Sequence, residues 1–128
     1  MSSKHTLKNS LQEAVFKCYL TGSSGGVVDI SLEDDVCQAS ETFDASEASV
    51  TIQEIYWGAK KDKQIDISRI TDAGANTVHG HYYLHDVGHY DFVGFVDDVY
   101  SSKDIRILID GPGHVIIKLR KVSGFTPT

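Results

Sequence analysis

The segment IRILIDGPGHVIIKL, residues 105–119, indicates the class of fold more clearly than any other part of the chain. Large aliphatic residues occupy the odd positions on both sides of a tight turn, Asp-Gly-Pro-Gly at 110–113, and several even positions between them are polar. Apolar residues at every second position are typical of a β-strand with one face in the core. The segment therefore predicts two antiparallel strands joined as a β-hairpin.

The rest of the chain repeats this alternation in shorter segments. They lie at 11–20, 28–32, 50–57, 65–68, 78–84 and 90–96. Turns rich in glycine, serine or asparagine separate several of them, for example at 21–26 and 71–77. Valine and isoleucine together number 23, and such β-branched side chains suit a pleated sheet. We predict an all-β fold: a single-domain β-sandwich or jelly roll of about eight antiparallel strands, spanning residues 1–128.

Some parts of the chain fit this pattern less simply. Residues 1–10 are predicted to be a flexible N-terminal tail, and the acidic, serine-rich residues 33–49 a loop. An amphipathic helix stays open as an alternative for 11–20, because several of its apolar residues also fit helical spacing. Cys18 and Cys37 follow no recognisable secretion signal, which favours two reduced thiols over a disulfide.

The charge balance disfavours some classes of partner. The 128 residues include 12 Lys and Arg against 18 Asp and Glu, which gives a formal net charge of −6. A nucleic-acid-binding protein needs a basic patch that neutralises phosphates, so no nucleic acid is expected as a partner. No apolar run approaches the ~20 residues that span a bilayer, and no membrane partner is expected either.

A group of histidines is the main candidate for chemistry. His79, His81, His85 and His89 fall within a short segment that also contains Asp86 and Asp91. Residues two apart in a strand share a face, so His79 and His81 would project together. With His114 they would offer three nitrogen ligands to Zn, Fe or Mn. The alternative is that these odd-numbered histidines lie on the solvent-exposed face of their strands and bind no metal. The even-numbered residues would then form the opposite, apolar face.

The same histidines resemble the two sequence motifs of the cupins. Cupins are jelly rolls with a glycine, a His-x-His pair and a glutamate in the first motif, and a proline–glycine turn before a histidine in the second. The matching residues here are Gly74, His79, His81, Pro112, Gly113 and His114. This resemblance implies a small metal-binding enzyme that uses His79, His81 and His114. No glutamate follows His81, and His85 or Asp86 would have to replace it.

Aromatic residues give another candidate, a carbohydrate-binding module. Rings that are exposed on a β-sandwich could stack on sugar rings, although core packing and subunit interfaces are commoner uses. The residues are Tyr56, Trp57, Tyr82, Tyr83, Tyr90 and Tyr100. No nucleophile elbow and no phosphate-binding glycine loop occur in the sequence.

Parts of the chain resemble short virion structural proteins of tailed bacteriophages, most nearly those of phages of marine cyanobacteria. The resemblance rests on four segments: 55–60 (IYWGAK), 65–69 (IDISR), 88–92 (GHYDF) and 115–124 (VIIKLRKVSG). It implies a component of the phage particle and no particular enzymatic activity. Head decoration and a place in the tail both stay open.

On the resemblance to virion proteins, we predict a non-enzymatic virion structural protein that acts through self-assembly and subunit contacts. We expect a homo-oligomer, such as a trimer, that contacts other virion proteins through edge strands and exposed aromatic residues. We expect no catalytic residues, no cofactor and no metal, and a location in the virion after assembly in the host cytoplasm. The cupin-like metalloenzyme and the carbohydrate-binding module are the alternatives.

Overall fold

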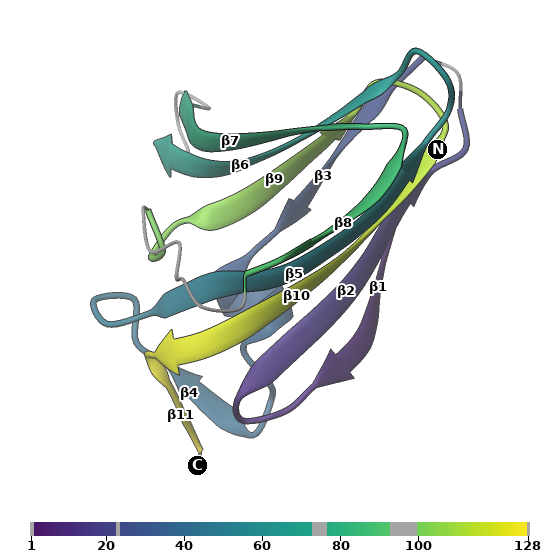
Figure 1. Ribbon diagram of the computed structural model, residues 1–128. Coiled ribbons are helices and arrows are strands. Elements are labelled where there is room, and N and C mark those ends of the chain that lie inside the picture. The colour runs from purple at the N-terminus through teal and green to yellow at the C-terminus, as the bar shows by residue number, and fades with distance from the viewer. Residues whose placement is uncertain (1, 23, 73–76, 93–99, 128) are drawn as a thin grey trace.

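Two antiparallel β-sheets pack face to face and enclose the core (Figure 1). The computed structural model describes residues 2–22, 24–72, 77–92 and 100–127. The first sheet has the strand order β1-β2-β10-β5-β8, the second β3-β9-β6-β7, and a small third sheet pairs β11 with β4. The strands are β1 (Ser2–Asn9), β2 (Glu13–Leu20), β3 (Gly26–Ile30), β4 (Glu41–Phe43), β5 (Ser49–Ala59), β6 (Gln64–Asp72), β7 (Thr77–His85), β8 (Val87–Asp91), β9 (Asp104–Ile109), β10 (Gly113–Ser123) and β11 (Phe125–Pro127). The prediction of an all-β sandwich is confirmed.

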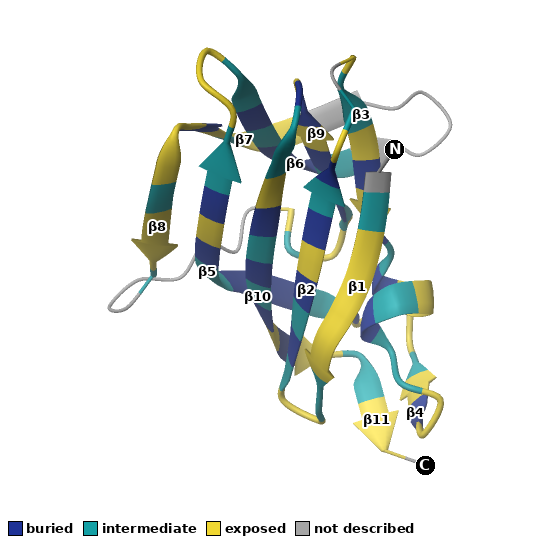
Figure 2. Ribbon diagram, turned by 90° about the vertical axis from the view of Figure 1, so that its right-hand side faces the viewer, coloured by how far each residue is buried: buried dark blue, intermediate teal, exposed yellow. Residues whose placement is uncertain are grey.

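Alternating side chains fill the space between the two sheets, as bands of buried and exposed residues along the strands show (Figure 2). In β2 the even-numbered residues from Ala14 to Leu20 are buried, so this segment is a strand and the helical alternative is wrong. Val115, Ile117 and Leu119 of β10 are fully buried beside them. Burial of these aliphatic and aromatic side chains is the main force that holds the two sheets together.

Residues 105–119 form two strands as predicted, but they do not form a hairpin. β9 pairs with β3 and β6, whereas β10 pairs with β2 and β5 in the opposite sheet. The connection between them passes from one sheet to the other. Two backbone hydrogen bonds fix it: Asp110 N donates to Gln64 O (3.0 Å), and Lys60 N donates to Pro112 O (3.0 Å). The hairpin prediction failed because alternation shows which face of a strand is buried and does not show which strand pairs with it.

Three other connections cross between the sheets at the same end of the sandwich. They join β2 to β3, β5 to β6, and β7 to β8. The last is the tightest, because a single residue, Asp86, separates the two strands. Asp86 has a φ of 59°, a left-handed conformation that asparagine and aspartate tolerate better than most residues. β7 and β8 are therefore edge strands of different sheets that meet at one corner.

The N-terminal residues are a strand and not the predicted flexible tail. β1 pairs along β2, with one bulge between Thr6 and Lys8. Lys4 also reaches the neighbouring sheet, where its Nζ donates to Asp29 O (2.9 Å) and pairs with the Asp35 carboxylate (2.7 Å). The sequence gives little sign of this strand because most of its side chains are exposed and its pairing depends on backbone hydrogen bonds.

The predicted loop at 33–49 contains a helical turn, η1 (Leu32–Val36), and strand β4. Leu32, Val36 and Ala48 extend the core beneath them. The strand predicted at 90–96 begins earlier, as β8, and residues 93–99 lie outside the described part of the chain, as do 73–76 of the predicted turn. Across the described residues, no helix is long and apolar enough to span a membrane.

A bulge in β5 changes which residues face the core. Val50 and Ile52 are buried at even positions, whereas Ile55 and Trp57 are buried at odd positions. The pairing of β10 with β5 shifts between Lys118 and Leu119, opposite this change of phase. Bulges of this kind redirect side chains, and this one turns the even-numbered residues after position 53 to the outer face.

Candidate functional site

The structure does not bring His79, His81 and His114 together. His79 and His81 lie on β7 of the four-stranded sheet, whereas His114 lies on β10 of the five-stranded sheet. The His114 imidazole covers Gly58, where an added Cβ would lie 2.6 Å from its Cε1. Gly74, the remaining residue of the first cupin-like motif, falls outside the described residues. The geometry therefore does not provide the three-histidine site that the cupin resemblance implies.

His79 and His81 also differ from each other in their contacts, because a bulge lies between them. Gly80 between them has a φ of 68°, and the pairing of β6 with β7 shifts at this point. His79 stacks on Tyr100, with 5.0 Å between ring centroids. His81 Nδ1 lies 2.9 Å from Asp66 Oδ1, and its ring stacks on Tyr83 at 5.4 Å. The rule that residues two apart share a face assumes an unbroken strand, and the bulge removes that condition.

We expect the double substitution His79→Ala with His81→Ala to lower the free energy of unfolding by less than about 1 kcal/mol. Both histidines are exposed, and the contact of His81 with Asp66 lies at the surface, where even fully charged pairs contribute little. Urea unfolding of the variant and the wild type measures the difference. A loss of several kcal/mol together with loss of a bound metal would instead indicate a coordination site shared by these two residues.

A different group of potential ligands lies on the outer face of the five-stranded sheet. Ligand atoms of Glu54, His89 and Asp91 all lie within 4.8 Å of one another, the only such group among the described histidine, cysteine and acidic residues. Glu54 lies directly opposite Asp91 in the pairing of β5 with β8. His89 and Asp91 are two apart on β8 and share its outer face, because this strand pairs without a bulge.

Tyr56 holds this group in place. Its ring lies parallel to the His89 imidazole, with 4.0 Å between centroids and 5° between planes. Its hydroxyl donates to Glu54 Oε2 (3.1 Å). That hydrogen bond is the main reason why the pKa of Tyr56 is raised, followed by loss of hydration and by the negative charges of Glu54 and Asp91. One tyrosine thus orients two of the three potential ligands.

Sequence reasoning noted His89 and Asp91 within the histidine-rich segment but did not select them. The available signal was the His-x-Asp spacing at 89–91, the same spacing that drew attention to His79 and His81. Glu54 gave no signal, since its approach to β8 depends on the bulge in β5 and on the pairing of two strands distant in sequence.

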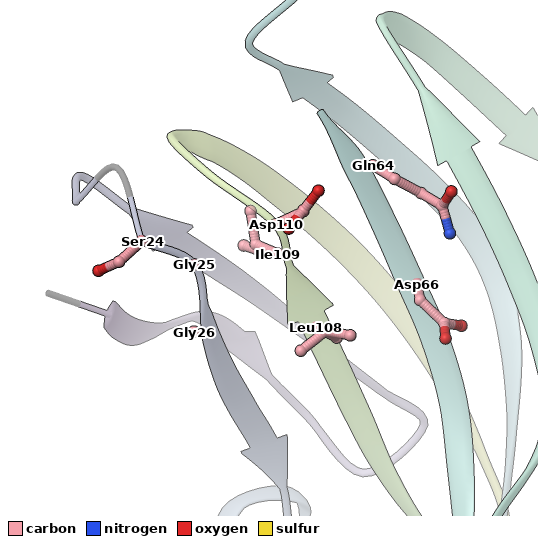
Figure 3. Close-up of a pocket in the computed structure, with 8 residues that line it drawn as sticks. All are labelled: Ser24, Gly25, Gly26, Gln64, Asp66, Leu108, Ile109 and Asp110. Carbon is pink, nitrogen blue, oxygen red and sulfur yellow. The ribbon is translucent and has the colours of Figure 1, made fainter. Parts of the chain in front are cut away.

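A hollow of about 420 Å³ lies on the four-stranded sheet, next to the end where the chain changes sheets (Figure 3). Its wall combines the glycines at the start of β3 with residues of β6 and β9. The Asp66 carboxylate points away from those glycines (Figure 3). Its Oδ1 lies 2.9 Å from Nδ1 of His81, which belongs to β7. None of the described residues that line the hollow is a histidine or a cysteine.

The aromatic residues do not form one sugar-binding platform. Trp57 is buried, and its Nε1 donates to His85 O (2.9 Å). Tyr56 lies on the outer face of the five-stranded sheet with one side of its ring covered by His89, whereas Tyr83 belongs to the other sheet. Tyr82 and Tyr90 pack toward the core side, where Tyr90 contacts Trp57 at 5.0 Å. The exposed rings are therefore distributed over separate surfaces.

The two cysteines are free thiols, as predicted. Cys18 is buried in β2, and this burial raises the pKa of its thiol to about 12. A thiol with such a pKa is almost entirely protonated at neutral pH, and the nucleophilic form of cysteine is the thiolate. Cys18 is therefore a core residue and not a candidate nucleophile.

The segments that resemble phage virion proteins occupy both sheets. Residues 55–60, 88–92 and 115–124 include parts of β5, β8 and β10 in the five-stranded sheet, and 65–69 lies in β6. These strands include the edge that carries Glu54, His89 and Asp91. No protein-family model and no curated protein matches the chain.

Proposed function

We propose that this protein is a non-enzymatic structural protein of a phage virion and that it acts by self-assembly along strand β8. The observation that carries the proposal is the edge formed by β8, which lacks the features that protect the other edge strands. The resemblance to virion proteins gives the biological setting, since such proteins work through contacts between many copies. The partner that we assign to this edge is a second copy of the chain.

The other edge strands of the two large sheets are protected. β1 carries a bulge and two lysines, Lys4 and Lys8, and both features discourage pairing with another strand. β1 also lies beside β3, with Lys4 bonded to Asp29 O, so that one sheet edge shields the other. β7 is interrupted by the bulge at Gly80.

β8 has none of these protections. Its sequence, VGHYD, contains no lysine, arginine or proline, and its pairing with β5 is regular. Its flanking residues bond to β5: Asp86 O accepts from Ala59 N (2.7 Å), and Phe92 N donates to Gln53 O (3.0 Å). Because alternate residues of an antiparallel strand bond to opposite sides, the odd-numbered residues of β8 direct their N–H and C=O groups outward. Among the described residues, no strand pairs with this side.

Apolar side chains next to this edge support an interface. Val87 is 81% exposed and Tyr90 is 45% exposed. A stable interface usually buries at least about 1,000 Å², more than pairing of a five-residue strand supplies, and these side chains add apolar area. Antiparallel pairing of β8 with β8 of a second copy would produce a two-fold dimer with a continuous sheet.

We expect Val87→Lys to convert an oligomeric protein into monomers, because a lysine on an exposed edge opposes strand pairing. The matched control is Val122→Lys, which places the same charge at an exposed valine of the internal strand β10. Sedimentation velocity in the presence of a chelator measures the mass of wild type and both variants. A monomeric wild type, or an oligomer that Val122→Lys disrupts and Val87→Lys does not, would contradict assembly along β8.

A further inference from the structure

We propose that Glu54, His89 and Asp91 bind one divalent transition-metal ion of the class of Zn²⁺ on the outer face of the β5–β8 edge. The site requires one chain only, so it does not depend on the self-assembly proposed above. It is also distinct from the three-histidine site of the cupin resemblance, since it includes none of those histidines.

The chemistry of the three side chains fits this class of ion. Imidazole nitrogen favours zinc, iron, nickel or copper, whereas carboxylate oxygens alone would favour magnesium or calcium. Zn²⁺ commonly takes histidine nitrogen together with aspartate or glutamate oxygen. Two carboxylates and one neutral imidazole would compensate the two positive charges, and water would complete the coordination because His89 and Asp91 are exposed.

The distances are close to those of a coordination sphere. Zinc holds such ligands at about 2.0–2.2 Å, so neighbouring ligand atoms around it lie about 3–3.5 Å apart. The three ligand atoms here lie within 4.8 Å of one another, and rotations of these side chains on the outer face can shorten the separations. The backbone already places Glu54 opposite Asp91, and Tyr56 opposite His89.

Tyr56 supplies the support that metal ligands usually receive from their neighbours. It stacks on the His89 ring and donates a hydrogen bond to Glu54, which restricts both side chains before an ion arrives. Lys118, which lies opposite Glu54 on β10, directs its Nζ to Glu13 Oε2 (3.3 Å). The nearest lysine of β10 therefore has a different carboxylate as its partner in the structure.

Isothermal titration calorimetry with ZnCl₂ tests the site. The protein carries no tag, and it is first dialysed against a chelator and then against chelator-free buffer. We expect one zinc ion per chain in the wild type. His89→Ala, Asp91→Asn and Glu54→Gln should each weaken binding at least about tenfold, because losing even a supporting residue of a metal site costs about 10–100-fold. Tyr56→Phe keeps the stack, removes the hydroxyl, and should weaken binding less than the loss of a ligand.

Three matched variants serve as controls. His85→Ala removes an exposed histidine at the end of β7, in the other sheet. His114→Ala and the double variant of His79 and His81 remove the histidines of the alternative site. All should bind zinc like the wild type. Absence of stoichiometric binding in the wild type would overturn the proposal, as would binding that survives His89→Ala or is lost in a control. Circular dichroism verifies that each variant is folded. If His89→Ala does not fold, the isosteric variants Asp91→Asn and Glu54→Gln still test the site.

Discussion

Replacing Lys121 with methionine should lower the free energy of unfolding by about 3–5 kcal/mol, because it leaves a buried carboxylate without its charged partner. Lys121 Nζ lies 2.6 Å from Glu41 Oε1, and the two side chains are only 2% and 0% exposed. The ammonium group also donates to Asn9 Oδ1 (2.7 Å) and lies 5.4 Å from the centre of the Phe125 ring. This one side chain thus connects β10 to β4, β1 and β11.

The double variant Lys121→Met with Glu41→Leu tests whether the unpaired Glu41 carboxylate causes this loss of stability. Replacement of a whole buried ion pair by apolar residues of similar size is often neutral or stabilising, so the double variant should recover most of the loss. Among the described residues Glu41 Oε2 has no hydrogen-bond partner, which adds to the cost of burying this carboxylate. Arg120→Met, at the exposed neighbouring position, is the control and should have little effect. Urea unfolding that shows a cost below about 1 kcal/mol for Lys121→Met would contradict a buried pair.

Phe16→Ala should also lower the free energy of unfolding by about 3–5 kcal/mol, the range for truncation of a buried aromatic residue. Phe16 is fully buried in β2 and lies opposite Ile117 of β10, so alanine would leave a cavity between the sheets. Lys17→Ala changes the next residue, which faces outward, and should alter stability by no more than about 0.5 kcal/mol. Equal effects of the two substitutions in thermal or urea unfolding would show that the inward and outward faces of β2 have been misassigned.

The residues that fill the core could be predicted because their alternation is regular. The odd positions of 105–109 and 115–119 are buried, as the pattern indicates. Lys121 continues the same phase and also faces inward, where its ammonium group pairs with Glu41. Its partner, Glu41, lies in a segment predicted to be a loop, and no local pattern connects two residues so distant in sequence.

The candidate metal site could be predicted only in part, for a related reason. His89 and Asp91 share a face by simple strand geometry. Glu54 reaches that face because the β5 bulge changes the phase of the strand, and β-bulges of this kind leave no simple alternation to follow. The same difficulty applies to His79 and His81, where the bulge at Gly80 separates two side chains that a regular strand would place together.

The position of β10 determines when this chain can fold during its synthesis. β10 lies between β2 and β5 in the five-stranded sheet, yet it leaves the ribosome after both of them. Among the described strands, only β1–β2 and β6–β7 pair with a direct neighbour in sequence, so most of the structure depends on contacts between distant residues, and such topologies fold slowly. Until residues 113–123 emerge, β2 and β5 have no strand between them, and their apolar faces remain available to chaperones or to other nascent chains.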